Sequence, residues 1–315
     1  MNWTKNFSNS ASPAKSTWNL FFLVMAIGGA ASSAQGKLQV VTTTPDLRQL
    51  VETVGSMDVN VSALAKGTQD PHLIEAKPSF MVRLRDADLV IAQGLELEEA
   101  WIKPLIEGCS NRKIAMGTKG YLELGGSLNP LEVASGQVTR AGGDVHPGGN
   151  PHFQLDPIRM GQAARLIADR LAELDPAHGK AFLERARQFE GQMTEKTKAW
   201  QKRIDTCGVK EVVTHHKTFS YFLDRFKLKS DIQLEPRPGI PPTASHLIDV
   251  IEQMKKRKIS LVLIEEYFAD DAGEKIQREV PGVIVQRVAV SADAQPLQEV
   301  IEALVKTIER ACSKK

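Results

Sequence analysis

HGKAFLERARQFEGQMTEKTKAWQKRID, residues 178–205, is the segment around which the rest of the chain is arranged. Its apolar side chains, among them Phe182, Phe189 and Trp200, recur at the spacing of one face of a helix. The pattern predicts one long helix, and such an aromatic stripe is typical of packing against a core. Together with the amphipathic segment before it, this helix gives an expected helical region over residues 158–205.

The chain before this region alternates short apolar runs with helical patterns. Residues 37–47 (KLQVVTTTPDL) predict a strand with a helix that begins near Pro45, and the apolar runs at residues 86–94 (DADLVIAQG) and 112–117 (RKIAMG) predict two further strands. Helical patterns lie between them, at residues 47–55 and 79–87. Strands that alternate with helices are typical of a parallel sheet with right-handed crossovers. We therefore expect an N-terminal α/β lobe over residues 35–157.

The same alternation resumes after the long helix. The apolar runs that predict strands are at residues 211–216, 259–266 and 282–290. The patterns that predict helices are at residues 218–226, 246–258, 271–280 and 297–312. We expect a C-terminal α/β lobe over residues 206–315. The predicted fold class is thus α/β, with two lobes that each hold a mostly parallel sheet flanked by helices, connected by a single long rigid helix. A cleft between two lobes is a natural place for a ligand.

The first 34 residues are expected to form a signal peptide. Lys5 and Lys15, without any acidic residue, precede the short apolar core NLFFLVMAIGGAA, and small residues follow up to Ala34. This order is typical of secretory signal peptides, and the apolar core is too short to span a membrane. A buried N-terminal helix is the alternative. No cysteine follows the apolar core at the cleavage point, so we expect a soluble periplasmic protein without a lipid anchor there.

Composition and charge argue against several classes of partner. The chain of 315 residues is 42% hydrophobic and 25% charged, which is ordinary for a globular protein of one or two domains. Without the two lysines of the signal peptide, 38 basic residues (40 minus 2) face 38 acidic residues. A formal charge of zero gives no general electrostatic reason to bind nucleic acid or an anionic membrane.

The cysteine count allows at most one internal disulfide. Cys109, Cys207 and Cys312 are all in the mature chain, and an oxidising compartment permits one pair among them. Cys207 and Cys312 are expected in the same lobe, so we favour that pair. Three buried free thiols are the alternative.

Histidines from three separate segments are candidates for a metal site. His72 follows an expected strand, and His152 lies just before an expected helix start. His215 and His216 end the expected strand EVVTHH. Ligands of open α/β sheets bind beyond the carboxyl ends of the strands, so these imidazoles are expected near one face. Convergent imidazoles suit borderline divalent metals such as zinc, and carboxylates can complete the shell. The alternative is that each histidine caps a helix or hydrogen-bonds a loop.

Three motifs in order resemble a known family. DPHLIEAKPSFMVRLRDADLVIAQGLELEEAW, residues 70–101, is similar to the Asp-Pro-His segment of the metal-binding solute receptors of ABC importers, of the zinc and manganese type. NPHFQLDP resembles the family's second histidine motif, with Asn150 in place of the usual aspartate and Gln154 in place of the usual aromatic residue. HKTFSYFLDRFKL resembles the third motif, His-x-x-Phe-x-Tyr-Phe, which selects His216 over His215. The similarity covers nearly the whole mature chain.

The resemblance implies which residues hold the metal. His72 and His152 from the N-terminal side and His216 from the C-terminal lobe match the family's three histidine ligands. The family's fourth ligand is an aspartate just before the last helix, where this chain has Asp293 in surroundings that depart from the family pattern. Glu265, at a strand end, is the alternative fourth ligand.

Two further segments are compared with the family. Zinc members often carry a tract rich in histidine and acidic residues where this chain has the glycine-rich segment 125–150. Near the end of that segment, Asp144 and His146 are the only acidic residue and the only histidine. We therefore expect a long surface loop without a metal-gathering tract. His246, in a proline-rich stretch that opens a helix, is expected on the helix surface and not in the metal site.

The expected function is that of a monomeric periplasmic receptor that captures Zn²⁺, with Mn²⁺ as the alternative, and delivers it to an ABC permease in the inner membrane. Two rivals remain open. Three histidines with an open fourth position also suit a zinc-dependent hydrolase, although no His-Glu-x-x-His and no Gly-x-Ser-x-Gly sequence is present. The other rival is a receptor or adhesin of the same fold with a different ligand.

Overall fold

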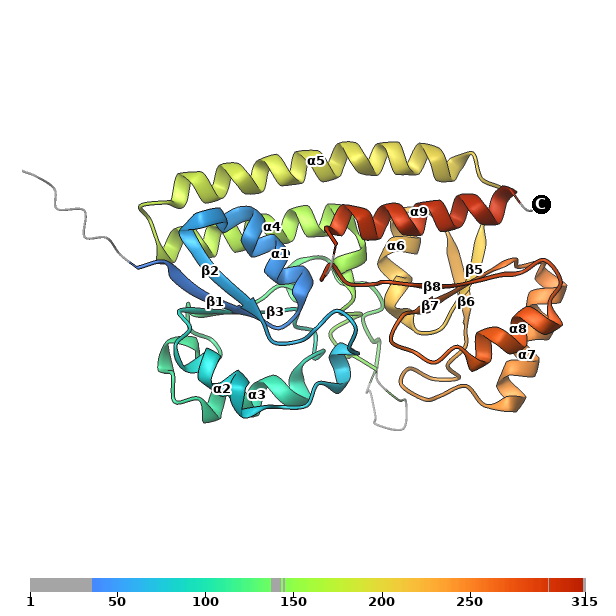
Figure 1. Cartoon of the computed structure of the whole chain (residues 1–315), viewed down its shortest axis with the longest axis horizontal. Coiled ribbons are helices and arrows are strands. Elements are labelled where there is room, and N and C mark those ends of the chain that lie inside the picture. The colour runs from blue at the N-terminus through green and yellow to red at the C-terminus, as the bar shows by residue number, and fades with distance from the viewer. Residues whose placement is uncertain (1–35, 137–142, 144, 294, 314–315) are drawn as a thin grey trace, which may run out of the picture. The chain divides into compact units, whose positions relative to one another are not determined.

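The computed structural model describes residues 36–136, 143, 145–293 and 295–313 (Figure 1). The predicted signal peptide, residues 1–34, lies outside the described residues. Residues 37–315 form one compact unit. A search of the described helices finds none with the length and apolar character needed to cross a bilayer.

The N-terminal lobe holds a four-stranded parallel sheet with the strand order β2-β1-β3-β4. Its strands are β1 (Leu38–Thr42), β2 (Val59–Ala63), β3 (Leu89–Ala92) and β4 (Tyr121–Glu123). Its helices are α1 (Pro45–Gly55), α2 (Pro78–Arg85) and α3 (Glu99–Gly108). Residues of β3 point alternately to two separate clusters of the core, with Leu89 and Ile91 in one and Val90 and Ala92 in the other. Both faces of the sheet are therefore covered, which explains the unbroken apolar run of this strand.

The C-terminal lobe repeats this plan with the strand order β6-β5-β7-β8, again parallel. Its strands are β5 (Glu211–Thr214), β6 (Lys229–Gln233), β7 (Leu261–Glu265) and β8 (Ile284–Val288). Its helices are α6 (Ser220–Arg225), α7 (Ala244–Arg257), α8 (Asp271–Glu279) and α9 (Leu297–Ser313). In β7, Leu261 and Leu263 face one core cluster whereas Val262 and Ile264 face another. The predicted α/β class with two parallel sheets flanked by helices is confirmed.

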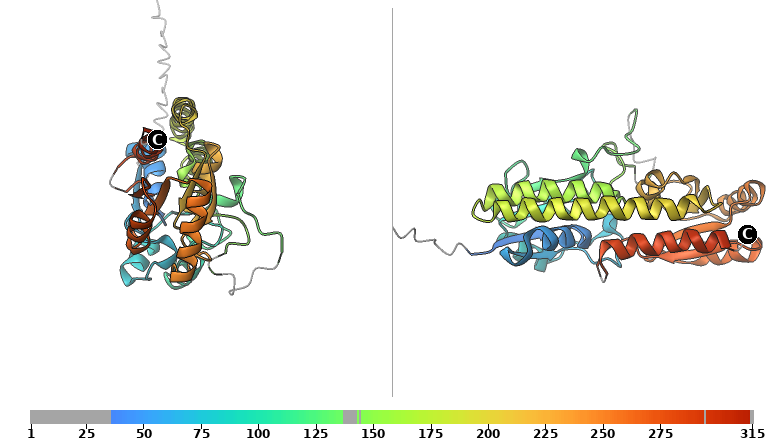
Figure 2. Two further views of the ribbon diagram at one scale, coloured as in Figure 1. Left: turned by 90° about the vertical axis from the view of Figure 1, so that its right-hand side faces the viewer. Right: turned by 90° about the horizontal axis from the view of Figure 1, so that it is seen from above.

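Helix α5 (Gly179–Asp205) runs past both sheets, and α4 (Pro157–Leu174) lies beside its first half (Figures 1 and 2). Near its start, Arg185 forms an ion pair with Asp58, which lies just before β2. Near its end, Arg203 forms ion pairs with two glutamates of α9, Glu302 at 2.8 Å and Glu309 at 2.7 Å. One continuous core cluster also includes residues of α5 and of both sheets. The helix is thus anchored to both lobes, as its apolar periodicity predicts, while the exact lobe boundaries at 157 and 205 stay predictions.

The prediction of a strand at residues 112–117 is wrong. Arg112–Ile114 form a short 3-10 helix, and the strand β4 follows it at Tyr121–Glu123. The amide nitrogen of Asn111 donates to the carbonyls of Leu84 and Ala87, and its side-chain oxygen accepts from the backbone of Lys113. These bonds fix a turn at this point, because an Asn side chain competes with regular strand pairing.

Two elements were not predicted from the sequence. Helix α3 buries Trp101, Ile102, Leu105 and Ile106, although Pro104 lies inside it. Strand β6 lies at an edge of its sheet and is mostly polar, so it lacks the apolar run that marks the central strands.

The predicted disulfide between Cys207 and Cys312 is confirmed, with a Cα–Cα distance of 5.5 Å. It joins the segment after α5 to the last turn of α9. Cys109 is buried and free.

Candidate metal centre

The three predicted histidines lie just beyond the carboxyl ends of strands or at helix starts. His72 is in a short 3-10 helix (Pro71–Leu73). The side chain of Asp70 caps this helix by accepting a hydrogen bond from the backbone nitrogen of His72. His152 precedes a 3-10 helix that leads into α4, where Asp156 accepts bonds from the backbone of Ile158 and Arg159. His216 comes two residues after β5. The side chain of Asp156 therefore caps the N-terminus of α4.

The structure brings these three imidazoles together. The ring centroids of His72 and His152 are 5.1 Å apart, and each lies 5.4 Å from the centroid of His216. Each residue offers one ring nitrogen, and these nitrogens all lie within 4.8 Å of one another. Side chains from both lobes therefore converge on a space of the size of one ion.

Carboxylates orient two of the three rings. Nδ1 of His72 lies 2.7 Å from Oδ1 of Asp70, and Nδ1 of His216 lies 2.6 Å from Oε2 of Glu235. Each carboxylate accepts the proton on Nδ1, so Nε2 is left with its lone pair toward the cluster. This arrangement of carboxylate, histidine and metal is common in zinc sites, where it fixes the tautomer and raises the basicity of the ligand. Burial is the largest single effect and lowers the pKa of His216, but the hydrogen bond to Glu235 and the charges of the nearby carboxylates together outweigh it, so the pKa is raised overall.

The imidazole of His152 gives the strongest indication of a ligand at this site. Its side chain is buried, with 1% of the residue exposed, and neither ring nitrogen has a hydrogen-bond partner among the described residues. Buried polar atoms nearly always have a partner, so an orphaned imidazole indicates a missing ligand. Its pKa lies well below the usual value, chiefly because burial disfavours the charged form and secondarily because of the neighbouring histidines. The ring is thus held neutral, as a metal ligand must be.

The backbone around His152 is tied to both lobes. Asn150, which replaces the family's aspartate, accepts a bond from the backbone nitrogen of His152 at 2.9 Å. Its amide donates to the carbonyl of Lys217, next to His216, at 2.9 Å. The hydroxyl of Tyr221 donates to the carbonyl of Asn150 at 2.5 Å. The side-chain amide of Asn150 can donate to the carbonyl of Lys217, whereas a carboxylate at this position cannot. Asn150 in place of aspartate therefore provides the hydrogen bond to the C-terminal lobe.

The two acids considered for the fourth position lie differently. Asp293 is not in the group that converges: Oδ1 of Asp293 pairs with Arg48 at 3.2 Å, and Oδ2 accepts from the backbone of Gly67 at 2.8 Å. Glu265 is fully buried at the end of β7, and neither of its oxygens has a hydrogen-bond partner within the described ranges. Burial raises the pKa of Glu265 to about 7, and the charge of His216 acts against this rise.

One histidine near the cluster was not predicted as part of it. Nε2 of His146 lies 3.2 Å from Nε2 of His72, with the ring centroids 5.3 Å apart. The sequence signal was present, because His146 is the only histidine of the segment 125–150. One histidine does not make a metal-gathering tract, so the sequence alone does not assign His146 to the site.

The other histidines serve different contacts. His215 stacks on Phe268 with a centroid distance of 4.1 Å, and burial lowers its pKa to about 4. His246 lies 2.9 Å from the carbonyl of Gln233, and His178 bonds to Asp175 at the far end of the first lobe.

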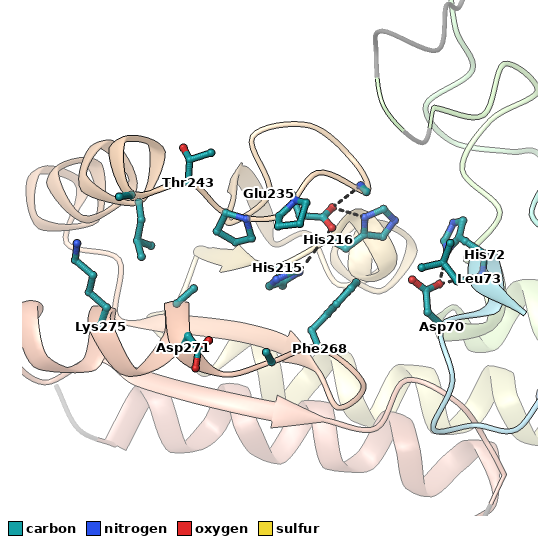
Figure 3. A pocket seen from close by; sticks show the side chains of 17 residues that line it. Asp70, His72, Leu73, His215, His216, Glu235, Thr243, Phe268, Asp271 and Lys275 are labelled. Atoms are coloured by element: carbon teal, nitrogen blue, oxygen red, sulfur yellow. Dashed lines mark hydrogen bonds and ion pairs between the residues drawn. The ribbon is translucent and has the colours of Figure 1, made fainter.

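A cavity of about 580 Å³ opens beside the cluster (Figure 3). His72 and Asp70 lie at one end of it, and His216 and Glu235 border it from the C-terminal lobe, while Lys275 lies at the other end. The walls between them are mostly apolar, including Phe268. Two of the three histidines, His72 and His216, thus border a space large enough to admit a hydrated ion.

Comparison with known proteins decides the family. Residues 40–311 match the family model described as the periplasmic component A of a zinc-uptake complex, ZnuA. The chain belongs to the ZnuA family. The resemblance that the three histidine motifs carry is confirmed at this level.

Individual relatives of the ZnuA family are distant in sequence. The chain is 28% identical over 246 residues to the high-affinity zinc uptake system protein ZnuA of Yersinia pestis, covering 73% of this chain and 76% of that protein. It is 25% identical over 248 residues to the zinc-binding lipoprotein AdcA of Streptococcus pneumoniae, covering 78% of this chain. The chain spans about half of the first curated relatives it matches, 48% of AdcA.

Solved structures of the same fold include a zinc-bound ZnuA with residues 138–173 deleted, with a TM-score of 0.75 and 24% identity over 88% of this chain and 98% of that one. A further one is the binding protein FpvC of Pseudomonas aeruginosa in complex with Mn²⁺, with a TM-score of 0.74 and 24% identity over 88% of this chain and 99% of that one. These likenesses confirm the two-lobed architecture of the ZnuA family.

Proposed function

We propose that this chain is a periplasmic receptor that binds Zn²⁺ between its lobes and delivers it to an ABC permease. The observation that carries the proposal is the convergence of three ring nitrogens within 4.8 Å, with His152 buried and without any other described partner. Membership of the ZnuA family, and relatives named for zinc uptake, support the same function.

His72, His152 and His216 are the proposed metal ligands. Asp70 and Glu235 hold the Nδ1 protons of two of them, so Nε2 of each of these rings is the nitrogen that binds the ion. Because ligands from both lobes bind the same ion, binding ties the lobes together. A set of nitrogen donors favours zinc over manganese, which prefers oxygen ligands, so Mn²⁺ is the weaker alternative.

Glu265 is the acid that we propose to act on the ion, in preference to Asp293. The Asp293 carboxylate already pairs with Arg48, whereas the Glu265 carboxylate is buried without a described partner and interacts with the charge of His216. Once Glu265 is ionised, its buried negative charge beside the three imidazoles lowers the free energy of a divalent cation in the site.

Export and the role of a receptor belong to the same proposal. We propose that residues 1–34 direct the chain across the inner membrane, and that the mature protein acts as a monomer without catalytic activity. N-terminal sequencing of the periplasmic protein tests the cleavage. Incubation of the zinc-loaded protein with ester, amide and phosphate substrates tests for a hydrolase.

The decisive experiment is a calorimetric titration of the metal-free protein with Zn²⁺ and, separately, with Mn²⁺. The expected result is one equivalent of zinc per chain, bound more tightly than manganese. The His152→Ala variant should lose most of the zinc affinity, since it removes the buried orphan imidazole. Zinc binding that is unaffected in this variant contradicts the assignment.

A further inference from the structure

We propose that His146 supplies a fourth nitrogen ligand to the metal and so makes the site selective for zinc. The inference rests on the proposed function, because it concerns the same ion. It goes beyond it by assigning a ligand that neither of the two acids provides.

The spacing of the two ring nitrogens is the first argument. A tetrahedral zinc ion with Zn–N bonds of about 2.0–2.1 Å holds its ligand nitrogens roughly 3.3 Å apart. Nε2 of His146 and Nε2 of His72 are 3.2 Å apart. The two nitrogens thus already lie at the distance that separates two ligands of one ion.

The tautomers agree with this placement. Nδ1 of His72 donates to Asp70, so the neutral ring has its lone pair on Nε2, and Nε2 of His146 carries the proton between them. When the ion enters, the neutral ring of His146 changes tautomer: Nε2 loses its proton to solvent while Nδ1 takes one up, so the ring stays neutral and presents its lone pair on Nε2. Both facing lone pairs are then available to the metal.

His146 also borders the other two ligands. A small cavity of about 80 Å³ is lined by His146, His152 and His216, together with neighbouring residues. The cavity lies between three of the four imidazoles, and the remaining one, His72, is at hydrogen-bond distance from His146. His146 therefore borders the same small space as His152 and His216, from the side of the loop.

The backbone near His146 is held in place by the preceding part of the same loop. Gly149 donates to the carbonyl of His146 at 3.1 Å, and Ala134 donates to the carbonyl of Pro147 at 3.2 Å. Asn150, whose side chain links the lobes, donates from its backbone to the carbonyl of Leu131 at 2.8 Å. The imidazole is thus presented on a fixed turn, and a small movement of the half-buried ring brings it to the ion.

The rival for the fourth position is Glu265. Its carboxylate is fully buried, and neither Glu265 nor His146 is in the group of donor atoms that converge within 4.8 Å; of the two, His146 lies at hydrogen-bond distance from a member of that group, with Nε2 3.2 Å from Nε2 of His72. The negative charge of an ionised Glu265 near the site stabilises the ion without a direct bond to it. Four nitrogen donors favour zinc over manganese more strongly than three nitrogens and one oxygen do.

X-ray absorption spectroscopy of the zinc-loaded protein tests the inference, with His146→Ala as the variant and His178→Ala as the matched control. His178 lies on the surface at the turn before α5. We expect four nitrogen ligands in the wild-type protein and in the control, and three with a water oxygen in His146→Ala. In a titration with Zn²⁺ alone, His146→Ala should bind roughly tenfold more weakly, with a smaller change for Mn²⁺ alone.

Two results would overturn the inference. One is a first shell and a zinc affinity in His146→Ala that equal those of the wild-type protein. The other is a carboxylate oxygen in the wild-type shell that disappears in Glu265→Gln. Either result leaves the proposed function standing. That function fails only if the wild-type protein binds no zinc, or if alanine variants of His72, His152 and His216 bind zinc as tightly as the wild type does. Thermal unfolding of metal-free His146→Ala should match the wild type, since the ring is in a surface loop.

Discussion

The rings of His72 and His216 lie 5.4 Å apart and nearly perpendicular, at 77°, although one belongs to the N-terminal lobe and the other to the C-terminal lobe. Each is held by its own carboxylate, Asp70 on one side and Glu235 on the other. Under the proposed function, each lobe thus supplies a histidine ligand together with the acid that orients it.

Replacing His216 with alanine should weaken zinc binding by roughly tenfold or more, since it removes a direct ligand. Replacing the adjacent His215 should change the affinity far less, because its ring stacks on Phe268 and is not in the converging group. Calorimetric titration of both variants measures the difference. Equal losses would show that the wrong imidazole was assigned.

Changing Glu235 to glutamine should lower zinc affinity by about 10- to 100-fold, because Nδ1 of His216 loses its charged acceptor. Glu132→Gln is the matched control, since Glu132 pairs with Lys217 beside the same histidine. Titration with zinc is the measurement. If both variants bind zinc equally well, the carboxylate does not orient the ligand.

The pH dependence of stability should change in Glu98→Gln. Glu98 is buried, accepts bonds from the backbone of Gln93 and Gly94, and has its pKa raised by burial from 4.5 to about 7. Between these two values the folded protein keeps a proton that the unfolded chain releases, so this group makes the wild-type protein less stable as the pH rises. The glutamine variant lacks the effect.

The Tm of Glu98→Gln minus the Tm of the wild-type protein should therefore increase between pH 4.5 and pH 8. Above pH 7 it should level off. Glu99→Gln, at an exposed neighbouring position, serves as the control and should show a flat difference. A flat difference for Glu98→Gln as well would mean that burial does not shift its titration.

Reduction of the disulfide should lower the stability of the metal-free protein. Cys207 and Cys312 are 105 residues apart in the sequence, so the bridge removes much conformational freedom from the unfolded chain, on the order of 4 kcal/mol. Thermal unfolding with and without reductant should show a decrease of roughly 10 °C in Tm. Cys207→Ser/Cys312→Ser should match the reduced protein and respond no further to reductant.

Local patterns were sufficient to predict most of the architecture. The unbroken apolar runs of β3 and β7 and the periodicity of α5 are set by which faces are buried, and burial leaves a signal in sequence. The edge strand β6 lacks that signal, and the turn at Arg112 depends on bonds from Asn111 to residues about 25 positions away.

The candidate site shows a similar division. His72, His152 and His216 each lie in a recognisable motif, so they were found one at a time. The engagement of Asp293 by Arg48, on helix α1, and the approach of His146 to His72 are long-range contacts. No local pattern encodes them, because they depend on how separate segments pack.

A crystal structure of the protein with zinc bound tests the central claim most directly. The account predicts a single ion between the lobes, with the Nε2 atoms of His72, His152 and His216 each about 2.0–2.1 Å from it. An ion bound elsewhere, or bound by fewer than these three imidazoles, would contradict it.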